Sequence, residues 1–250
     1  MDWEISLSKP NIVYSNYDLA FKELPEDLKI HRFYFEQDRR GFGDRAFHAM
    51  WFELVKHFTI RKHLEIGVYR GQTLSLVAML QRIMGIKQNV TGISPLTKEG
   101  GSYSSYIDID YEGDILKNFH NFALCKQELI KANSTEDAAI KFIKKNDWDS
   151  IYIDGCHDYD VVKKDWEVCS SAIREGGIII LDDAALHTNF THGFQGFPGP
   201  SRVAKEIEKN LAFKKILQVG HNIVFCKLRQ DGPLSKGSIN HQYGTVELVI

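Results

Sequence analysis

The feature that most constrains this chain is an alternation of short apolar runs with amphipathic segments, which begins after Arg61. Such strand–helix repetition predicts a mainly parallel sheet with helices on its faces. The fifth apolar run, GGIIILDD, is apolar through its centre, as expected of a strand buried on both faces. The predicted strands are residues 63–67, 89–94, 127–132, 149–154 and 176–183, and the predicted helices are 73–84, 115–124, 134–146 (with Ser134 as N-cap), 159–173 and about 201–210.

The last part of the sheet follows a different pattern. Two apolar runs, 213–220 and 221–228, are joined only by the turn at Gly220. A connection this short permits only an antiparallel pair. The sequence therefore predicts an α/β fold with a doubly wound, seven-stranded, mainly parallel sheet whose last strand is antiparallel.

The segment before the alternation, residues 1–60, is aromatic and reads as irregular through residue 43, with Pro10 and Pro25 among its breakers. Asp44 is the predicted N-cap of a helix over RAFHAMWFELVKHF. We therefore divide the chain into an N-terminal aromatic and helical segment (1–60), a main domain (61–229) and a C-terminal tail (230–250). The first segment is interpreted as a lid or an oligomerisation segment. The tail ends in VELVI, which pairs either with a sheet edge or with a second subunit.

Charge and composition exclude several classes of protein. Among 250 residues the formal net charge is -2, which argues against a general binder of nucleic acid or of anionic membranes. No apolar run approaches the roughly 20 residues that span a bilayer, and the start lacks a secretory signal. The four scattered cysteines indicate reduced thiols, so we expect a cytoplasmic protein.

Polar side chains follow the predicted strands, at the edge where open α/β sheets bind ligands. In HLEIGVYRGQT, Gly67 and Gly71 let the backbone approach a ligand closely, and Glu65 can accept a hydrogen bond from a positively charged amino group. We predict that a cofactor is held by Glu65, Gly67, Tyr69, Gly71, Ser94 and Ser134.

Three aspartates, Asp154, Asp182 and Asp183, end neighbouring predicted strands. Carboxylates this close repel one another unless they are protonated or neutralised by a cation. A hard divalent ion such as Mg²⁺ accepts such ligands, so we predict a metal site here. The alternative is that one aspartate caps the following helix or faces solvent.

Three segments, taken in order, resemble class I S-adenosylmethionine-dependent methyltransferases. HLEIGVYRGQT resembles their first motif, and IYIDGCHDYDVVKKD resembles the D-G-x-H-x-Y signature of a subfamily that includes metal-dependent sugar and macrolide-sugar O-methyltransferases. GGIIILDDA resembles the fifth strand of that group. The resemblance implies a Rossmann-like class I fold, S-adenosylmethionine as cofactor, and methylation of a hydroxyl of a sugar, nucleotide-sugar or glycan with help from a metal.

Transfer to a hydroxyl requires a base that removes its proton. His157 is the predicted base, because its reference pKa lies near neutrality and it follows Asp154 on the same turn. Asp154 is predicted to act with it, as a metal ligand, a base or both. The alternative for His157 is a hydrogen-bonded turn histidine, and His187 is a weaker candidate base. In the loop that follows, Phe190, Phe194 and Phe197 form either an apolar wall or an anchor.

The second strand departs from the family pattern. Class I methyltransferases usually end it with an acid that binds both ribose hydroxyls, and here Ser94 stands in that place. Either Ser94 makes a single hydrogen bond, or Asp108 or Asp110 contributes. The chain also lacks the GxGxxG and second-strand acid of a dinucleotide-binding fold, which argues against NAD.

Two other functions fit the same fold. One is an iron-dependent, hydroxylase-like relative, in which the acidic cluster would hold iron. The other is a degenerate methyltransferase fold that serves as a binding module, which Ser94 suggests. The retained Glu65, Asp154 and His157 argue against the second, since a module without chemistry has little need of them.

Overall fold

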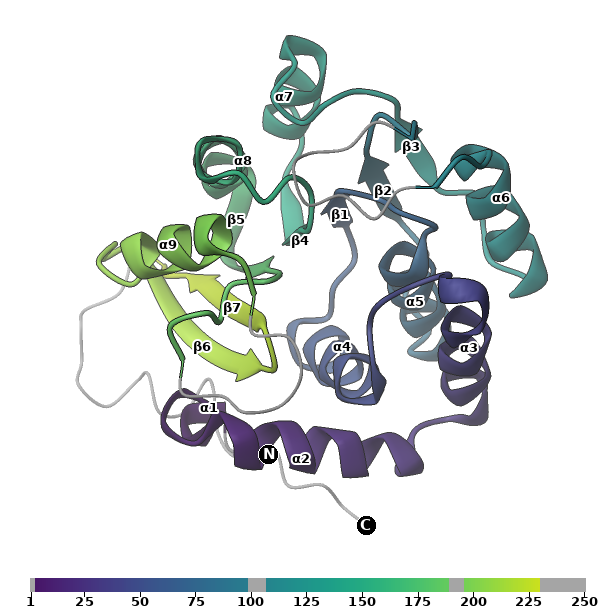
Figure 1. Ribbon diagram of the computed structural model, residues 1–250, viewed down its shortest axis with the longest axis horizontal. Helices are drawn as coiled ribbons and strands as arrows, with labels where there is room; N and C mark the ends of the chain where they lie inside the picture. The colour runs from purple at the N-terminus through teal and green to yellow at the C-terminus, as the bar shows by residue number, and fades with distance from the viewer. Residues whose placement is uncertain (1–2, 99–106, 189–195, 230–250) are drawn as a thin grey trace.

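The computed structural model describes residues 3–98, 107–188 and 196–229, and its centre is a seven-stranded sheet (Figure 1). The strand order is β3-β2-β1-β4-β5-β7-β6. Strand β7 pairs antiparallel with both β5 and β6, and the pairs among β1 to β5 are all parallel. The predicted sheet and its antiparallel last strand are thus confirmed. The strands are β1 (His63–Ile66), β2 (Val90–Ile93), β3 (Glu128–Ile130), β4 (Trp148–Ile153), β5 (Ile173–Leu181), β6 (Phe213–Val219) and β7 (Asn222–Lys227).

Helices cover both faces of the sheet. On one face lie α4 (Arg45–Phe58), α5 (Gln72–Ile83) and α6 (Tyr111–Asn121), and on the other lie α7 (Asp137–Lys144), α8 (Tyr159–Ala172) and α9 (Pro198–Ile207) (Figure 1). Strand β5 shows why two layers form: Ile178 and Ile180 enter one apolar core, and Ile179 and Leu181 enter the other. Side chains alternate along a strand, so an uninterrupted apolar run requires a cover on each side.

The N-terminal segment is helical, so the expectation of an irregular chain through residue 43 is wrong. It forms α1 (Trp3–Ser8), α2 (Pro10–Ala20) and α3 (Glu26–Glu36), with short 3-10 turns at Phe21–Glu23 and Gln37–Arg39. The two prolines start helices here and do not interrupt them, because Pro10 occupies the first turn of α2 and Pro25 is the N-cap of α3. A helix needs no hydrogen bond from the amides of its first turn, which makes proline acceptable there.

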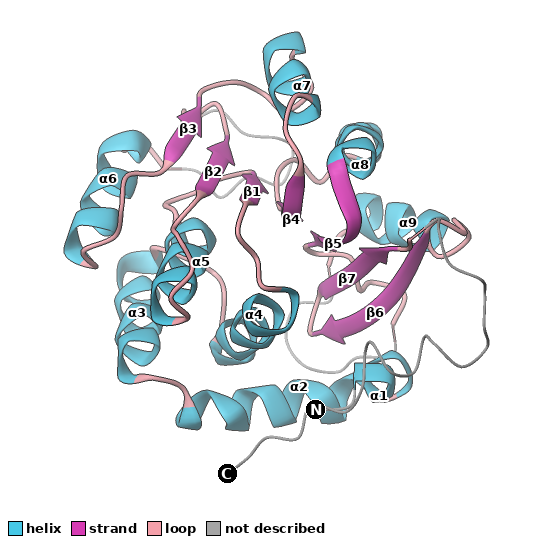
Figure 2. Ribbon diagram, turned by 180° about the vertical axis from the view of Figure 1, so that it is seen from behind, coloured by secondary structure: helices cyan, strands magenta, loops and turns pink. Residues whose placement is uncertain are grey.

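These helices pack on the rest of the molecule. Helix α1 lies against β6 and α2 lies against α4 (Figure 2). Val13, Tyr17 and Leu28 are buried in the same core as α4 and α5. The role of residues 1–60 as a lid or an oligomerisation segment stays a prediction, and the tail with its VELVI end lies outside the described residues.

Two residues were predicted to be N-caps, and the observed starts of α4 and α7 confirm only one of them. Asp44 caps α4 as expected, since its carboxylate accepts a hydrogen bond from the Phe47 amide at 2.8 Å. Ser134 does not cap α7, which begins two residues later than predicted, after Glu136. The Glu136 carboxylate turns back to Asn133, which donates from its amide and its side chain and fixes the turn before the helix. None of the described helices is both long and apolar enough to span a membrane.

Candidate active site

The register of the sheet brings the predicted site residues together. Ile66 of β1 pairs with Ile153 of β4, which in turn pairs with Leu181 of β5. The residues that follow these three strands are Gly67, Asp154 and Asp182. They therefore stand side by side at the carboxyl edge, where open α/β sheets bind ligands.

Gly67 lets the turns after β1 and β4 touch. Its φ is +89°, and a Cβ atom added there would lie 2.0 Å from the carbonyl oxygen of Asp154. Both the left-handed backbone and the lack of space require glycine. The motif glycine thus sets the position of Asp154, because any side chain at residue 67 would push the two turns apart.

A cavity opens at this edge. Three of the predicted cofactor residues line it, Glu65, Gly67 and Tyr69, together with Asp154 and Asp182. Residues 40–44, from the N-terminal segment, form another wall. Gln72 fixes this wall by accepting from the Gly43 amide at 2.8 Å and donating to the Gly43 carbonyl at 3.1 Å.

The other predicted cofactor residues are not part of this lining. Gly71 is the N-cap of α5 with a φ of +79°. Ser94 is buried at the end of β2, and its hydroxyl accepts a long bond, 3.4 Å, from the Leu96 amide. The hydroxyl of Ser134 hydrogen-bonds to the carboxyl of Asp165 on α8. Their contact with a cofactor stays a prediction.

The two acids considered as substitutes for Ser94 have other partners. Asp110 caps α6 by accepting from the Gly113 amide at 3.0 Å, and Asp108 forms an exposed ion pair with Lys98 at 3.4 Å. The aromatic loop is described only from residue 196 onward, so Phe190 and Phe194 lie outside the described residues. His187 is exposed and lines a separate hollow beside α1 and α2.

Glu65 is buried in the cavity wall with 3% of its surface exposed. Burial, with a smaller contribution from the Asp182 charge, raises its pKa to about 8, although the Leu74 amide donates a hydrogen bond to the carboxyl. Its Oε2 atom has no hydrogen-bond partner within the described part of the chain. A buried carboxylate oxygen that faces a cavity without a partner fits a site for a cationic group.

Asp154 and Asp182 form a hydrogen-bonded acidic pair. Burial and the neighbouring charges of Asp182 and Asp183 raise the pKa of Asp154 well above its usual range. Burial and Asp183 also raise the pKa of Asp182, which is partly offset by His221 and by hydrogen bonds from Asp154 and Tyr152. Two negative charges this close repel each other, so a proton or a cation between the two carboxyls would reduce the repulsion.

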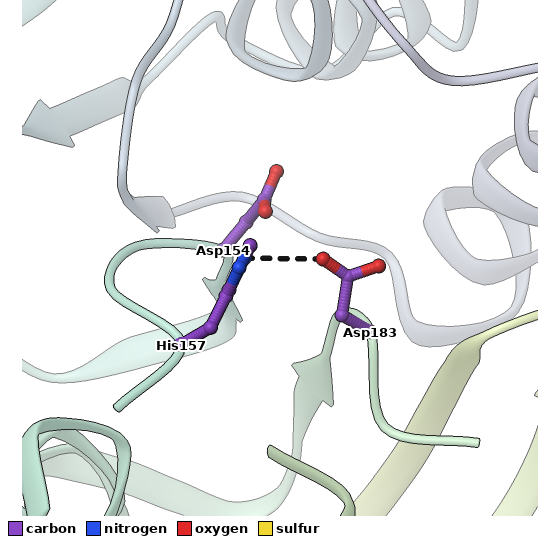
Figure 3. A group of neighbouring side chains, drawn as sticks. All are labelled: Asp154, His157 and Asp183. Carbon is purple, nitrogen blue, oxygen red and sulfur yellow. Dashed lines mark ion pairs between the residues drawn. The ribbon is translucent and has the colours of Figure 1, made fainter. Parts of the chain in front are cut away.

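His157 approaches this pair from the loop between β4 and α8. Its Nε2 atom pairs with Oδ2 of Asp183 (dashed line in Figure 3) at a distance of 3.1 Å. The ring of His157 stacks on Phe197 with centroids 4.2 Å apart. The carboxylate and the aromatic ring together fix the plane of the imidazole. Phe197 therefore contacts the predicted base, which gives the aromatic loop a direct role in the site.

Sequence reasoning missed His221, on the turn between β6 and β7. Its Nε2 atom lies 3.4 Å from Oδ1 of Asp182 and 3.9 Å from Oδ1 of Asp183. The antiparallel register places it there, since Leu181 pairs with Ile223 and the residue two positions before Ile223 must lie beside Asp183. The sequence placed His221 in the turn of the predicted hairpin, but it did not show that the last strand pairs with β5.

The structure gathers the predicted metal ligands into two groups that share Asp183. Among the described residues, the ligand atoms of Asp154, His157 and Asp183 lie within 4.8 Å of one another, as do those of Asp182, Asp183 and His221. Each group contains a histidine nitrogen beside carboxylate oxygens. The residues present thus fit a divalent cation, and the binding of an ion there stays a prediction.

Comparison with known proteins agrees with this architecture. A family model for a methyltransferase domain matches residues 64–184. A Staphylococcus aureus protein proposed to be a caffeoyl-CoA O-methyltransferase has a similar structure, with a TM-score of 0.62 at 16% identity over 85% of this chain and 96% of that one. A Bacillus cereus O-methyltransferase in complex with S-adenosylhomocysteine has a TM-score of 0.56 at 15% identity, over 82% of this chain and 92% of that one.

A third similar structure is a Podospora anserina methyltransferase with S-adenosylhomocysteine bound, with a TM-score of 0.59 at 12% identity over 82% of this chain and 89% of that one. An uncharacterized protein of Acanthamoeba polyphaga mimivirus is 26% identical over 150 residues, which are 58% of this chain. The aligned part spans 60% of that relative's length. At these identities the structural likenesses show that the chain has the class I methyltransferase fold.

Proposed function

We propose that this chain is a cytoplasmic S-adenosylmethionine-dependent O-methyltransferase that acts, with a divalent cation, on a hydroxyl of a sugar, nucleotide-sugar or glycan. The observation that carries the proposal is the His157–Asp183 pair, which lies beside Asp154 at the carboxyl edge of a methyltransferase-fold sheet. The substrate class is supported by the D-G-x-H-x-Y resemblance at residues 154–159.

The cofactor part of the proposal is supported by Glu65 and Gly67. When bound, S-adenosylmethionine supplies a methyl group on a positively charged sulfur. Glu65 offers a buried oxygen without a partner in the described chain, which suits the ammonium group of the cofactor, and Gly67 lets the backbone approach it. The wall formed by residues 40–44 would limit the access of water to this end of the cavity.

The acid–base part rests on His157 and Asp183. If the Nε2–H of His157 donates to Asp183 at 3.1 Å, the other ring nitrogen, Nδ1, is the basic one that can take the hydroxyl proton. Asp183 then stabilises the imidazolium that results, as the carboxylate of a catalytic triad does. Stacking on Phe197 keeps the ring in one plane during this transfer.

The metal part rests on the mutual repulsion of Asp154, Asp182 and Asp183. We propose Mg²⁺ or another divalent cation as the charge that neutralises them. When bound, such an ion lowers the pKa of a coordinated hydroxyl. Asp154, Asp182 and Asp183 would hold it, and Tyr152 would keep Asp182 oriented through its hydroxyl.

Calorimetric titration with S-adenosylhomocysteine, followed by transfer of labelled methyl groups to a panel of nucleotide-sugars, tests the proposal. Asp182→Asn should keep the dissociation constant for S-adenosylhomocysteine within about threefold and lose the metal-dependent turnover, by roughly a hundredfold or more. Asp27→Asn, at an exposed ion pair with Arg82, is the matched control. Absence of saturable binding would overturn the function, and unchanged kinetics of Asp182→Asn would remove the metal from it.

A further inference from the structure

The backbone of His221 is held against the end of β5. Its carbonyl oxygen accepts a hydrogen bond from the Ala184 amide at 2.9 Å, which continues the antiparallel ladder of β5 and β7. Gly220 has a φ of +59° and makes the tight turn that brings β6 to this point. The position of His221 is therefore fixed by the sheet, and its side chain is 30% exposed toward the cavity.

The two oxygens of Asp183 face different histidines. Oδ2 is paired with His157 at 3.1 Å, and Oδ1 lies 3.9 Å from Nε2 of His221. Asp182 completes the second group, with Oδ1 at 3.4 Å from the same nitrogen. Two ligands bound at about 2.1 Å to one ion stand roughly 3–3.5 Å apart, so the group needs only small shifts to close on a cation.

A buried oxygen that lacks a hydrogen-bond partner provides independent support for an occupant of this group. Oδ1 of Asp182 is buried and has no hydrogen bond within the described residues, although it faces His221. Buried polar atoms are rarely left without partners, and carboxylate oxygens left so point to a cation.

We infer that His221 is a nitrogen ligand of the divalent cation at Asp182 and Asp183, and that it makes this site select a transition-metal ion over Mg²⁺. The inference rests on the proposed function, because it concerns the metal of the same site. Mg²⁺ prefers oxygen ligands, whereas an imidazole ligand raises the affinity of a site for divalent transition-metal ions, least for Mn²⁺ and more for Co²⁺ and Zn²⁺. Asp183 would bind the ion through Oδ1 and keep its Oδ2 paired with His157. His157 therefore stays outside this ligand set and is available for the hydroxyl proton.

The test is Mn²⁺ binding to the full chain, measured by calorimetry and by pulsed electron paramagnetic resonance, which detects nitrogen bound to the ion. The wild-type protein should bind Mn²⁺ with a nitrogen coupling. His221→Gln should lose the coupling and weaken Mn²⁺ binding about tenfold or more, with Mg²⁺ affinity changed by less than about threefold. His157→Gln should keep the coupling, and His120→Gln, at an exposed residue, is the control.

The outcomes separate the inference from the function on which it rests. If the wild-type protein binds S-adenosylhomocysteine but no divalent ion, both this inference and the metal part of the proposal fail, and the methyltransferase survives. If Mn²⁺ binds and the nitrogen coupling remains in His221→Gln or disappears in His157→Gln, the inference alone is overturned. Circular dichroism of each variant confirms that it is folded, and His221→Asn repeats the test with a different side chain.

Discussion

Two pairs of histidines in this molecule have opposite environments. His31 and His48 are fully buried between the N-terminal helices and α5, with Nδ1 of His31 at 3.0 Å from Nε2 of His48. His157 and His221 stand at the carboxyl edge of the sheet, with 18% and 30% of their side chains exposed. The same residue type thus occurs once within a core and once on the wall of a cavity.

Their partners decide what each pair can do. His48 donates to the Asp44 carbonyl at 2.9 Å, and His31 reaches the Ser75 hydroxyl at 2.9 Å, so all partners of this pair are neutral. Burial lowers the pKa of both, that of His48 to about 3, which keeps the pair uncharged at neutral pH. His157 and His221 instead face the carboxylates of Asp183 and Asp182, which can accept hydrogen bonds from their ring nitrogens.

The comparison indicates that the buried pair holds the N-terminal helices on the first turn of α5. Ser75 also lies 2.6 Å from the Gly71 carbonyl, so the contact reaches the motif that begins α5. In the buried pair, histidine contributes two hydrogen-bonding nitrogens. At the sheet edge, its ability to take up and release a proton matters. Substitution should therefore affect stability in one pair and turnover in the other.

The largest effect is expected for His157→Ala. Loss of a general base lowers turnover by about 10² to 10⁴-fold, while the dissociation constant for S-adenosylhomocysteine and the melting temperature stay close to wild type. Steady-state kinetics with the acceptor found in the nucleotide-sugar screen measures this, with His120→Ala as the exposed control. A normal turnover number would eliminate His157 as the base.

His31→Ala should have the next largest effect, on stability. It leaves a cavity and removes a buried partner from both His48 and Ser75, so the free energy of unfolding should fall by about 2–3 kcal/mol. Urea denaturation measures the change, and His120→Ala, at an exposed residue, should stay within about 0.5 kcal/mol of wild type. An equally small change for His31→Ala would contradict the structural role of the pair.

A third expected effect is a pH dependence carried by Glu65. Its pKa is raised in the folded chain to about 8 from 4.5, so between these values the folded state holds a proton that the unfolded state has lost. Stability therefore falls as pH rises through this window, by at most about 1.4 kcal/mol per pH unit. Glu65→Gln should remove this slope and become more stable than wild type near pH 8.

Urea unfolding of the cofactor-free protein at pH 6, 7 and 8 measures the slope in both forms. Glu36→Gln, at an exposed carboxylate on α3, serves as the control. Parallel pH curves for wild type and Glu65→Gln would mean that Glu65 is ionised in the folded chain. That result would place a charge-neutralising partner at Oε2 even without the cofactor.

Most of the fold was determined by sequence alone, because its signals are local. The apolar run of β5 reports burial on two faces, Asp44 reports the start of α4, and the short connection at Gly220 permits only a hairpin. Each of these patterns reflects hydrogen bonding or packing within a few residues. The N-terminal helices were missed because Pro10 and Pro25 were interpreted as breakers, although proline also starts helices.

The site residues also separate into those that local sequence predicts and one that only the tertiary structure brings in. Asp154 and His157 lie on one turn, and Asp182 and Asp183 are adjacent in the sequence, so their proximity follows from the ends of two neighbouring strands. His221 lies far along the chain, and it joins them only because β7 inserts between β5 and β6 in antiparallel register. Strand order and register depend on how whole elements pack, which no local pattern records; only the tertiary structure decided which histidine the two aspartates would meet.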